Sequence, residues 1–223
     1  MTFMAYADRD VLAMQVANHL GGALQKLLNT QERVSFAVPG GTTPGPVFDL
    51  LSRMTLDWAR VTIVLTDERW VSERDERSNA ALVRRRLLSG EAARAGFVPY
   101  HHTQLSVEAG AQAAGKVVSP LLPLSLALLG MGADMHTASL FPNAEGLTQA
   151  LSKDAPPLCP IRVAGQGISR VTLSAQVLRD ASEKHLLITG TDKREALDRA
   201  MLLPEEQAPI AAVLKGGTVH WAA

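Results

Sequence analysis

Short apolar runs that alternate with helical patterns constrain the fold of this chain more than any other feature. Four such runs are Val34–Val38, Val61–Leu65, Leu124–Leu129 and His185–Thr189. Near-continuous apolar runs of this length are typical of strands that are buried on both faces of a sheet. Strands that alternate with helices are joined by crossover connections, which make neighbouring strands parallel. The sequence therefore predicts an α/β fold with a mostly parallel sheet flanked by helices.

Helices are predicted where apolar residues recur every three or four positions, or where a capping residue or a proline precedes them. The predicted helices are Asp8–Leu28, one that starts at Pro44, Ser78–Leu88 with Ser78 as its N-cap, and one that starts at Asp192. Two shorter runs, Val171–Ser174 and Thr218–Trp221, are strand candidates whose direction the pattern leaves open.

Length and composition favour a single domain over residues 1–223. The chain has 223 residues, of which 47% are hydrophobic, and no internal repeat or long Gly/Ser linker divides it. Lys plus Arg and Asp plus Glu number 22 each, so no overall positive field is present to attract nucleic acid or an acidic membrane surface. We expect neither as a partner, and the oligomeric state stays open.

The N-terminus and the cysteine content indicate where the protein works. Charged residues at Asp8–Asp10 interrupt the apolar core that an export signal needs. The most apolar stretch, Leu121–Met131, is much shorter than the roughly 20 residues of a membrane span. Cys159 is the single cysteine, which excludes a disulfide within the chain and a multi-cysteine metal site. We expect a cytoplasmic protein whose thiol is buried or idle.

Three loops with unusual polar chemistry follow predicted strands. They are Pro39–Thr43, Thr66–Val71 and Gly130–Asn143. In parallel α/β sheets, ligands bind outside the carboxyl ends of the strands. We therefore expect the three loops to form one site at that edge of the sheet.

The first loop has the composition of a phosphate-binding turn. Gly40 and Gly41 allow the backbone to approach a ligand closely, while Thr42 and Thr43 add hydroxyls just before a helix. The loop lacks the lysine of the nucleotide P-loop and the G-x-G-x-x-G pattern of dinucleotide sites, so ATP and NAD are poorly supported. An ordinary strand-to-helix turn capped by threonine is the alternative.

The second loop delivers two carboxylates and a guanidinium to the same edge of the sheet. Asp67, Glu68 and Arg69 directly follow a strand, and arginine suits bidentate recognition of a phosphate. A surface salt-bridge cluster is the alternative for Asp67 and Arg69, and it is the favoured interpretation of the charged run Glu73–Arg77.

The third loop is the most informative segment, because it places His136 two residues after Asp134 in a Gly-rich turn. Histidine suits proton transfer near neutral pH, and a neighbouring carboxylate can orient its ring. The remaining histidines lack this setting and are expected to be structural: His19, His101, His102, His185 and His220. The sequence contains no G-x-S-x-G elbow, no H-E-x-x-H helix and no C-x-x-C pair, so a water nucleophile fits best.

Five sequence blocks resemble those of 6-phosphogluconolactonases and occur in the same order. The blocks are PGGTTP at Pro39–Pro44, TDERWV at Thr66–Val71, SNAALVRRRLL at Ser78–Leu88, LALLGMGADMHTASLFPN at Leu126–Asn143 and SRVTLS at Ser169–Ser174. The fourth block is the most specific, and the resemblance covers nearly the whole chain. It implies a Rossmann-like α/β domain, related to glucosamine-6-phosphate deaminases.

The resemblance also implies an activity. Members of this family hydrolyse 6-phosphogluconolactone to 6-phosphogluconate, the second step of the oxidative pentose phosphate pathway, so the implied partner is a small sugar-phosphate lactone. No metal or organic cofactor is implied.

Site residues follow from the same resemblance. His136 matches the histidine that is taken as the general base activating water, with Asp134 as a supporting carboxylate. Whether Asp67 or Asp134 assists the imidazole stays open. For the phosphate, the resemblance points to a set of loop residues and cations: Gly40, Gly41, Thr42, Thr43, Arg69, Arg170 and Lys193.

Two positions depart from the family pattern. Met135 stands where the family usually has glycine, and a non-glycine residue tolerates positive φ poorly, so we expect a slightly different loop shape. Thr42 replaces the more usual serine but retains the hydroxyl. The adjacent arginines Arg84–Arg86 are either a basic rim of the site or, as favoured here, a solvated helix face.

Two other functions remain as alternatives. An aminosugar-phosphate deaminase or isomerase would use the same fold, but such enzymes typically carry a glutamate in an N-E-P run after the histidine, where this chain has Phe141–Asn143. A non-catalytic sugar-phosphate sensor would keep the pocket without the chemistry, and Met135 is the residue that leaves this possibility open.

Overall fold

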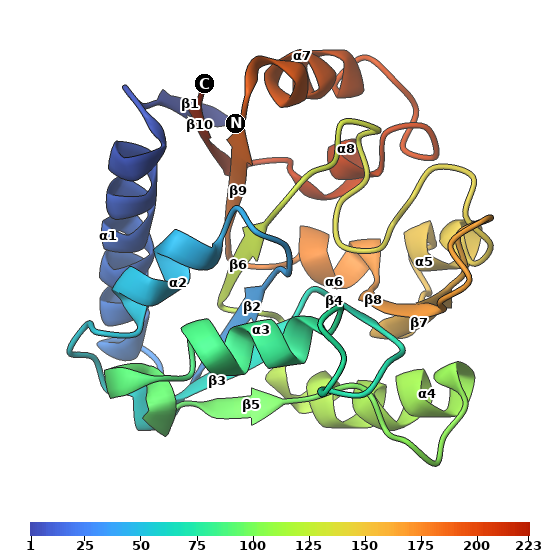
Figure 1. Ribbon diagram of the computed structural model, residues 1–223, viewed down its shortest axis with the longest axis horizontal. Coiled ribbons are helices and arrows are strands. Elements are labelled where there is room, and N and C mark those ends of the chain that lie inside the picture. Colours follow the sequence, from blue (N-terminus) through green and yellow to red (C-terminus); the bar gives the residue numbers. More distant parts are fainter.

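A seven-stranded parallel sheet with helices on both faces forms the centre of the computed structural model, which describes residues 1–223 (Figure 1). Its strands are β1 Thr2–Ala5, β2 Val34–Val38, β3 Val61–Leu65, β5 Gly96–Val98, β6 Leu126–Leu129, β9 Glu183–Thr189 and β10 Thr218–Ala222. The helices are α1 Arg9–Leu28, α2 Gly45–Leu51, α3 Asn79–Arg86, α4 Val107–Val118, α5 Leu147–Leu151, α6 Ala175–Arg179, α7 Thr191–Ala200 and α8 Pro209–Val213. In Figure 1, α1 and α2 lie to the left of the sheet, and α4, α6 and α8 lie to its right. The predicted fold class is confirmed.

Most predicted elements are found close to their predicted bounds. β2 and β3 coincide with the two predicted runs, and β10 pairs in parallel with both of its neighbours. The Ser78 hydroxyl oxygen accepts a hydrogen bond from the Ala81 N–H at 3.2 Å, so the predicted N-cap of α3 is confirmed. That helix ends at Arg86 rather than Leu88. The pattern missed β1 and β5, which have three or four residues and are too short to show a period.

The order of strands places a switch point in the middle of the sheet. The order is β1-β10-β9-β6-β2-β3-β5, and every neighbouring pair is parallel. From β2 the chain proceeds outward through β3 and β5, whereas from β6 it proceeds the opposite way through β9 and β10. Crossovers that diverge from two adjacent strands leave a crevice beyond their carboxyl ends. The first and third loops follow these two strands.

A second, three-stranded antiparallel sheet corrects one prediction. The segment Thr66–Val71 is predicted as a loop, yet it contains the strand β4 Asp67–Arg69. This strand pairs with β8 Arg170–Leu173, which also pairs with β7 Leu158–Ile161. Arg69 and Arg170 are direct partners in the antiparallel register. Two arginines far apart in the sequence are therefore held side by side.

The core is one contiguous cluster of 60 buried apolar residues that spans both faces of the main sheet. Its largest fully buried side chains include Trp58, Phe36 and Phe48, and the rest of the cluster is mainly aliphatic. A single core of this kind is the physical basis of a single domain. None of the helices combines the length and the apolar character that crossing a membrane requires.

Candidate active site

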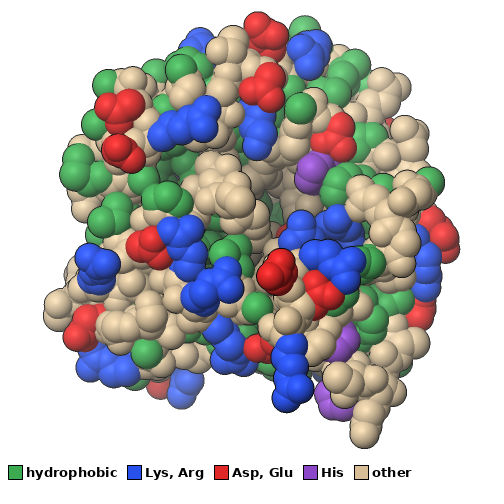
Figure 2. Space-filling view, in the orientation of Figure 1, with side chains coloured by type: hydrophobic (Ala, Val, Ile, Leu, Met, Phe, Trp, Pro, Cys, Tyr) green, Lys and Arg blue, Asp and Glu red, His purple; other side chains and the backbone are tan.

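A pocket lies outside the carboxyl ends of β2 and β6, at the switch point of the sheet. All three predicted loops contribute to its wall, together with the starts of β8, α3 and α7. Figure 2 shows a hollow near the middle of this face, bordered by Lys, Arg and His side chains. The lining includes every predicted phosphate-binding residue and both Asp67 and His136: Gly40, Gly41, Thr42, Thr43, Asp67, Arg69, His136, Arg170 and Lys193. The three loops that were expected to form one site therefore line one pocket.

The first loop needs glycine at two positions for different reasons. Gly41 has φ +89°, a left-handed conformation that side chains disfavour. Gly40 lies against the Asn79 side chain, and a Cβ atom at this position would be 1.9 Å from the Asn79 Oδ1 atom. The loop backbone therefore packs closely on the N-terminal end of α3. Its exposed face, with Thr42 and Thr43, is turned to the pocket.

Asp67 is held by donors from three segments. Its carboxylate accepts hydrogen bonds from the Ser139 hydroxyl at 2.5 Å and from the Thr66 hydroxyl at 3.2 Å. The Nη1 atom of Arg170 lies 4.0 Å from its Oδ2 atom. Asp67 is nearly buried and makes no hydrogen bond to His136. Its contacts fix the relative positions of β4, β8 and the third loop.

Three cations face the pocket, which gives it an excess of positive charge over Asp67. Arg69 donates hydrogen bonds from Nη1 to the Asn79 Oδ1 atom at 2.7 Å and to the Arg77 carbonyl at 3.0 Å. Burial and the charge of Arg69 lower the pKa of the Arg170 guanidinium. Lys193 adds a third positive charge from the first turn of α7. The positive charges of these three side chains repel each other. An anion bound between them would therefore be stabilised.

The Arg170 side chain is mostly enclosed. Its guanidinium lies 5.0 Å from the centre of the Phe141 ring, and its Nη2 atom donates to the Gln166 Oε1 atom at 2.8 Å. Its Nε atom is buried and has no hydrogen-bond partner. A buried unpaired donor is costly, so this group gains from a ligand that accepts its hydrogen bond.

His136 and Asp134 form a hydrogen-bonded pair. The Nδ1 atom of the imidazole lies 2.5 Å from the Asp134 Oδ1 atom, and the ring stacks on Phe141 with 4.0 Å between centroids. A carboxylate accepts hydrogen bonds, so in the neutral imidazole Nδ1 carries the proton and Nε2 has the free lone pair. A Cβ atom at Gly132 would lie 2.3 Å from the His136 ring, so this glycine is required for the pairing. The structure therefore brings Asp134, and not Asp67, to the imidazole.

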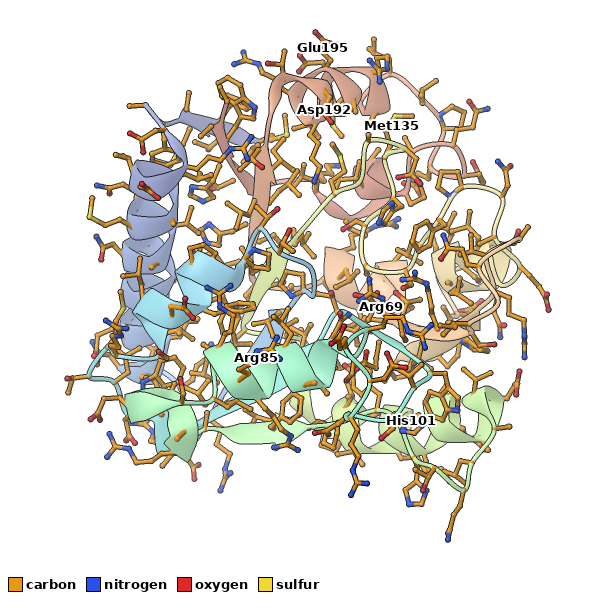
Figure 3. All side chains as sticks on the ribbon, in the orientation of Figure 1. Arg69, Arg85, His101, Met135, Asp192 and Glu195 are labelled. Carbon is orange, nitrogen blue, oxygen red and sulfur yellow. The ribbon has the colours of Figure 1, made fainter.

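Met135 occupies the position at which the family usually has glycine. Its φ is +66°, so the backbone keeps the left-handed conformation although the residue has a side chain. The Met135 carbonyl accepts a hydrogen bond from the Ile210 N–H in α8 at 3.2 Å, and the side chain packs against the core. Figure 3 shows Met135 in the loop next to α8 and Arg69 near the N-terminal end of α3. These contacts hold the loop in a form that retains the His136–Asp134 pair.

The remaining candidates from the sequence do not contribute to the pocket. Arg84 and Arg85 are exposed, as expected for the solvated helix face favoured from the sequence, while Arg84 pairs with Glu73 at 2.7 Å and Arg86 with Asp49. Cys159 is buried, and burial raises its pKa to about 11. His185 and His220 form a buried hydrogen-bonded pair at 2.9 Å. Burial lowers the pKa of His220 to about 3.

Sequence reasoning missed Asn79, Ser139 and Phe141 as parts of the site. All three lie in segments that were singled out, but their roles depend on which segments meet in space. Glu68 is a further case. It is fully buried, and its carboxylate accepts hydrogen bonds from the Asn79 and Ala80 N–H groups at 2.8 and 2.7 Å, which holds the start of α3 next to β4.

Glu68 is expected to make stability depend on pH. Burial raises its pKa from 4.5 to about 7, the donors of α3 limit the rise, and the charge of Asp67 adds to it. The folded protein then keeps a proton that the unfolded chain loses as the pH rises above 4.5. The free energy of unfolding should fall between about pH 4.5 and 7, by roughly 3 kcal/mol at most.

Urea denaturation across this pH range measures the effect. Glu68→Gln does not titrate and should lack this part of the pH dependence, whatever its own stability. Equal slopes for the two proteins would show that Glu68 titrates normally.

Fold and pocket together define a class of protein: an α/β protein with a cation-lined pocket at the switch point, whose lining histidine is hydrogen-bonded to an aspartate. The chain belongs to the family described as glucosamine-6-phosphate isomerases/6-phosphogluconolactonase, which matches residues 7–221. It is 39% identical over 213 residues to a 6-phosphogluconolactonase of Pseudomonas aeruginosa, covering 94% of this chain and 90% of the relative. It is 39% identical over 218 residues to one of Caulobacter vibrioides, covering 95% and 91%.

Solved structures agree with this assignment. The structure of a 6-phosphogluconolactonase from Shewanella baltica superposes with a TM-score of 0.95 at 32% identity, covering 100% of this chain and 98% of the other. A monomeric glucosamine-6-phosphate deaminase superposes with a TM-score of 0.77 at 19% identity, covering 100% and 97%. At that identity the second likeness shows a shared fold and nothing more.

Proposed function

We propose that this protein hydrolyses 6-phospho-D-glucono-1,5-lactone to 6-phosphogluconate. The observation that carries the proposal is the placement of His136, which is hydrogen-bonded to Asp134, in the same pocket as three cations, Arg69, Arg170 and Lys193. A phosphorylated lactone needs both features, because one end of it is a dianion and the other is an ester to be attacked by water. The names of the similar proteins support the same reaction.

The phosphate is proposed to bind at the cationic side of the pocket. Arginine forks match the geometry of phosphate oxygens, and Arg69 and Arg170 are adjacent partners of the β4–β8 ladder. The backbone and hydroxyls of Gly40–Thr43 and the Lys193 ammonium complete the proposed cradle. Anchoring the phosphate at a distance from the ester fixes the lactone carbonyl next to the histidine, which lowers the entropic part of the barrier.

His136 is the proposed general base. Its Nε2 atom takes a proton from water while the water oxygen forms a bond to the lactone carbonyl carbon, which gives a tetrahedral oxyanion. Backbone N–H groups of the glycine-rich loops are the proposed donors to this oxyanion. The bond from that carbon to the ring oxygen then breaks, and the imidazolium returns the proton to the departing oxygen. The acid product ionises and releases a proton to solvent.

Asp134 and Asp67 have different proposed roles. Asp134 keeps the imidazole in the tautomer with a basic Nε2 atom and stabilises the imidazolium, because it accepts the Nδ1–H bond. Asp67 is proposed to orient Arg170 and the Ser139 segment from its nearly buried position. It is therefore a positioning residue for the phosphate end of the pocket.

The two alternative functions are less well supported. Phe141 stacks on the His136 ring, in the run where deaminases of this fold typically carry a glutamate, so no carboxylate is supplied there for amino-sugar chemistry. A sensor without chemistry has no support from Met135, because the His136–Asp134 hydrogen bond is formed despite the positive φ.

Proton release on addition of freshly generated 6-phosphogluconolactone tests the proposal. A control without enzyme is required, because such lactones also hydrolyse spontaneously. Acceleration by the protein is the expected result. Ammonium release from glucosamine 6-phosphate, measured in parallel, would instead establish the deaminase, and binding without turnover of either compound would establish the sensor.

Asp134→Asn is expected to lower kcat by about 10- to 100-fold while product binding stays unchanged. The asparagine amide can donate to Nδ1, which would stabilise the tautomer in which Nε2 is protonated and unable to act as a base. Initial rates at saturating lactone measure the effect. Asp154→Asn, on an exposed aspartate outside the pocket, is the matched control. Full activity of Asp134→Asn would remove Asp134 from the mechanism.

A further inference from the structure

Asn79 lies where α3, β4 and the first loop meet, at the proposed phosphate end of the pocket. It is the first residue of α3, its side chain is almost completely buried, and it lines the pocket. It contacts β4 through Asp67 and Arg69, and it contacts the first loop through Gly40.

Both ends of the Asn79 amide are in use. Its Nδ2 atom donates to the Asp67 carbonyl at 2.9 Å and lies 3.4 Å from the Asp67 Oδ1 atom. Its Oδ1 atom accepts from Arg69 Nη1 at 2.7 Å. The amide carries a donor and an acceptor on one planar group, so it can make both contacts at once. An aspartate would keep the contact to Arg69 but lose the one to Asp67.

Close packing adds a second constraint. Because a Cβ atom on Gly40 would lie 1.9 Å from the Asn79 Oδ1 atom, the amide sits directly against the backbone of the first loop. The position of that loop is therefore tied to the position of the amide, and through it to the Arg69 guanidinium.

The helix itself does not need the Asn79 side chain. Ser78 caps α3 through its hydroxyl, and Glu68 accepts the N–H groups of Asn79 and Ala80. Orphan N–H groups at a helix start are normally satisfied in these ways. The buried amide thus serves the neighbouring loop and strand rather than its own helix.

We propose that Asn79 is a positioning residue that holds Arg69 and the Gly40 loop in register for the phosphate of the substrate. The inference rests on the function proposed above. Arg69 is ordered before the ligand arrives, which reduces the entropy lost on binding. Asn79 is not expected to take part in proton transfer, because the arrangement of His136 and Asp134 depends on Gly132.

The Asn79→Ala variant should raise KM for the lactone and Kd for 6-phosphogluconate by about 10-fold or more, with kcat changed by less than about 3-fold. Ser78→Ala is the matched control. It removes the cap of the same helix but no contact to Arg69 or Gly40, so it should lower thermal stability without changing KM. A purely structural role for Asn79 predicts that the two variants behave alike.

The Asn79→Asp variant keeps size and the acceptor for Arg69, so it covers the case in which Asn79→Ala fails to fold. It places a carboxylate beside Asp67 and beside the bound phosphate, so Kd for 6-phosphogluconate should rise. Calorimetry with 6-phosphogluconate gives this Kd independently of turnover. If wild type binds this compound but hydrolyses no lactone, the proposed function fails. Unchanged Kd in folded Asn79 variants would overturn the inference itself.

Discussion

His136→Ala is expected to reduce the enzyme-catalysed rate of lactone hydrolysis by about 10²- to 10⁴-fold, the range that a positioned general base contributes. The variant retains the loops and the cations of the pocket, so the phosphate still binds and the ester is still positioned. Water then has no base within hydrogen-bonding reach, and the departing ring oxygen has no nearby acid. The initial rate of proton release, corrected for spontaneous hydrolysis, measures the loss.

The controls for His136→Ala separate chemistry from folding. Binding of 6-phosphogluconate should change little, and far-UV circular dichroism should match that of wild type. His102→Ala, on an exposed histidine outside the pocket, should retain full activity. An His136→Ala variant that hydrolyses the lactone at the wild-type rate would remove His136 as the base and with it the proposed mechanism.

Arg170→Ala should weaken substrate binding by about 10- to 100-fold, seen as a higher KM and as a higher Kd for 6-phosphogluconate. The reason is that charge-assisted hydrogen bonds contribute about 1.5–3 kcal/mol each, and every 1.4 kcal/mol corresponds to a factor of ten. The side chain is enclosed between Asp67 and the Phe141 ring, so it cannot easily be replaced by a neighbouring cation. Calorimetric titration with 6-phosphogluconate measures the loss.

A conservative variant and a distant control sharpen the test of Arg170. Arg170→Lys keeps the charge but not the fork, so it should recover only part of the affinity. Arg162→Ala removes an arginine whose ion pairs with Glu108 and Glu145 lie outside the pocket, and it should bind normally. If Arg69→Ala, Arg170→Ala and Lys193→Ala all bound 6-phosphogluconate normally, the phosphate would have to bind elsewhere.

Much of the fold and the main site candidates were accessible from local patterns. The buried strands β2 and β3 were predicted with correct bounds, because an apolar run ended by glycine or by charged residues leaves few alternatives. The N-cap of α3 was predicted because a serine hydroxyl before a helix satisfies a backbone donor. The clustering of three loops followed from one rule about parallel sheets, and the pocket contains residues from all three.

The sequence by itself thus determined the α/β class, the loops that carry polar chemistry and the identity of His136 as the candidate base, since these depend on neighbouring residues along the chain. Tertiary structure alone decided the switch point between β2 and β6, the pairing of Arg69 with Arg170 in β4 and β8, and the choice of Asp134 over Asp67 as the partner of the imidazole. It also brought Asn79 to Gly40. These contacts join segments far apart in the chain or depend on the exact path of a glycine-rich turn, and such geometry is set by packing and hydrogen bonding of the whole domain rather than by local preference.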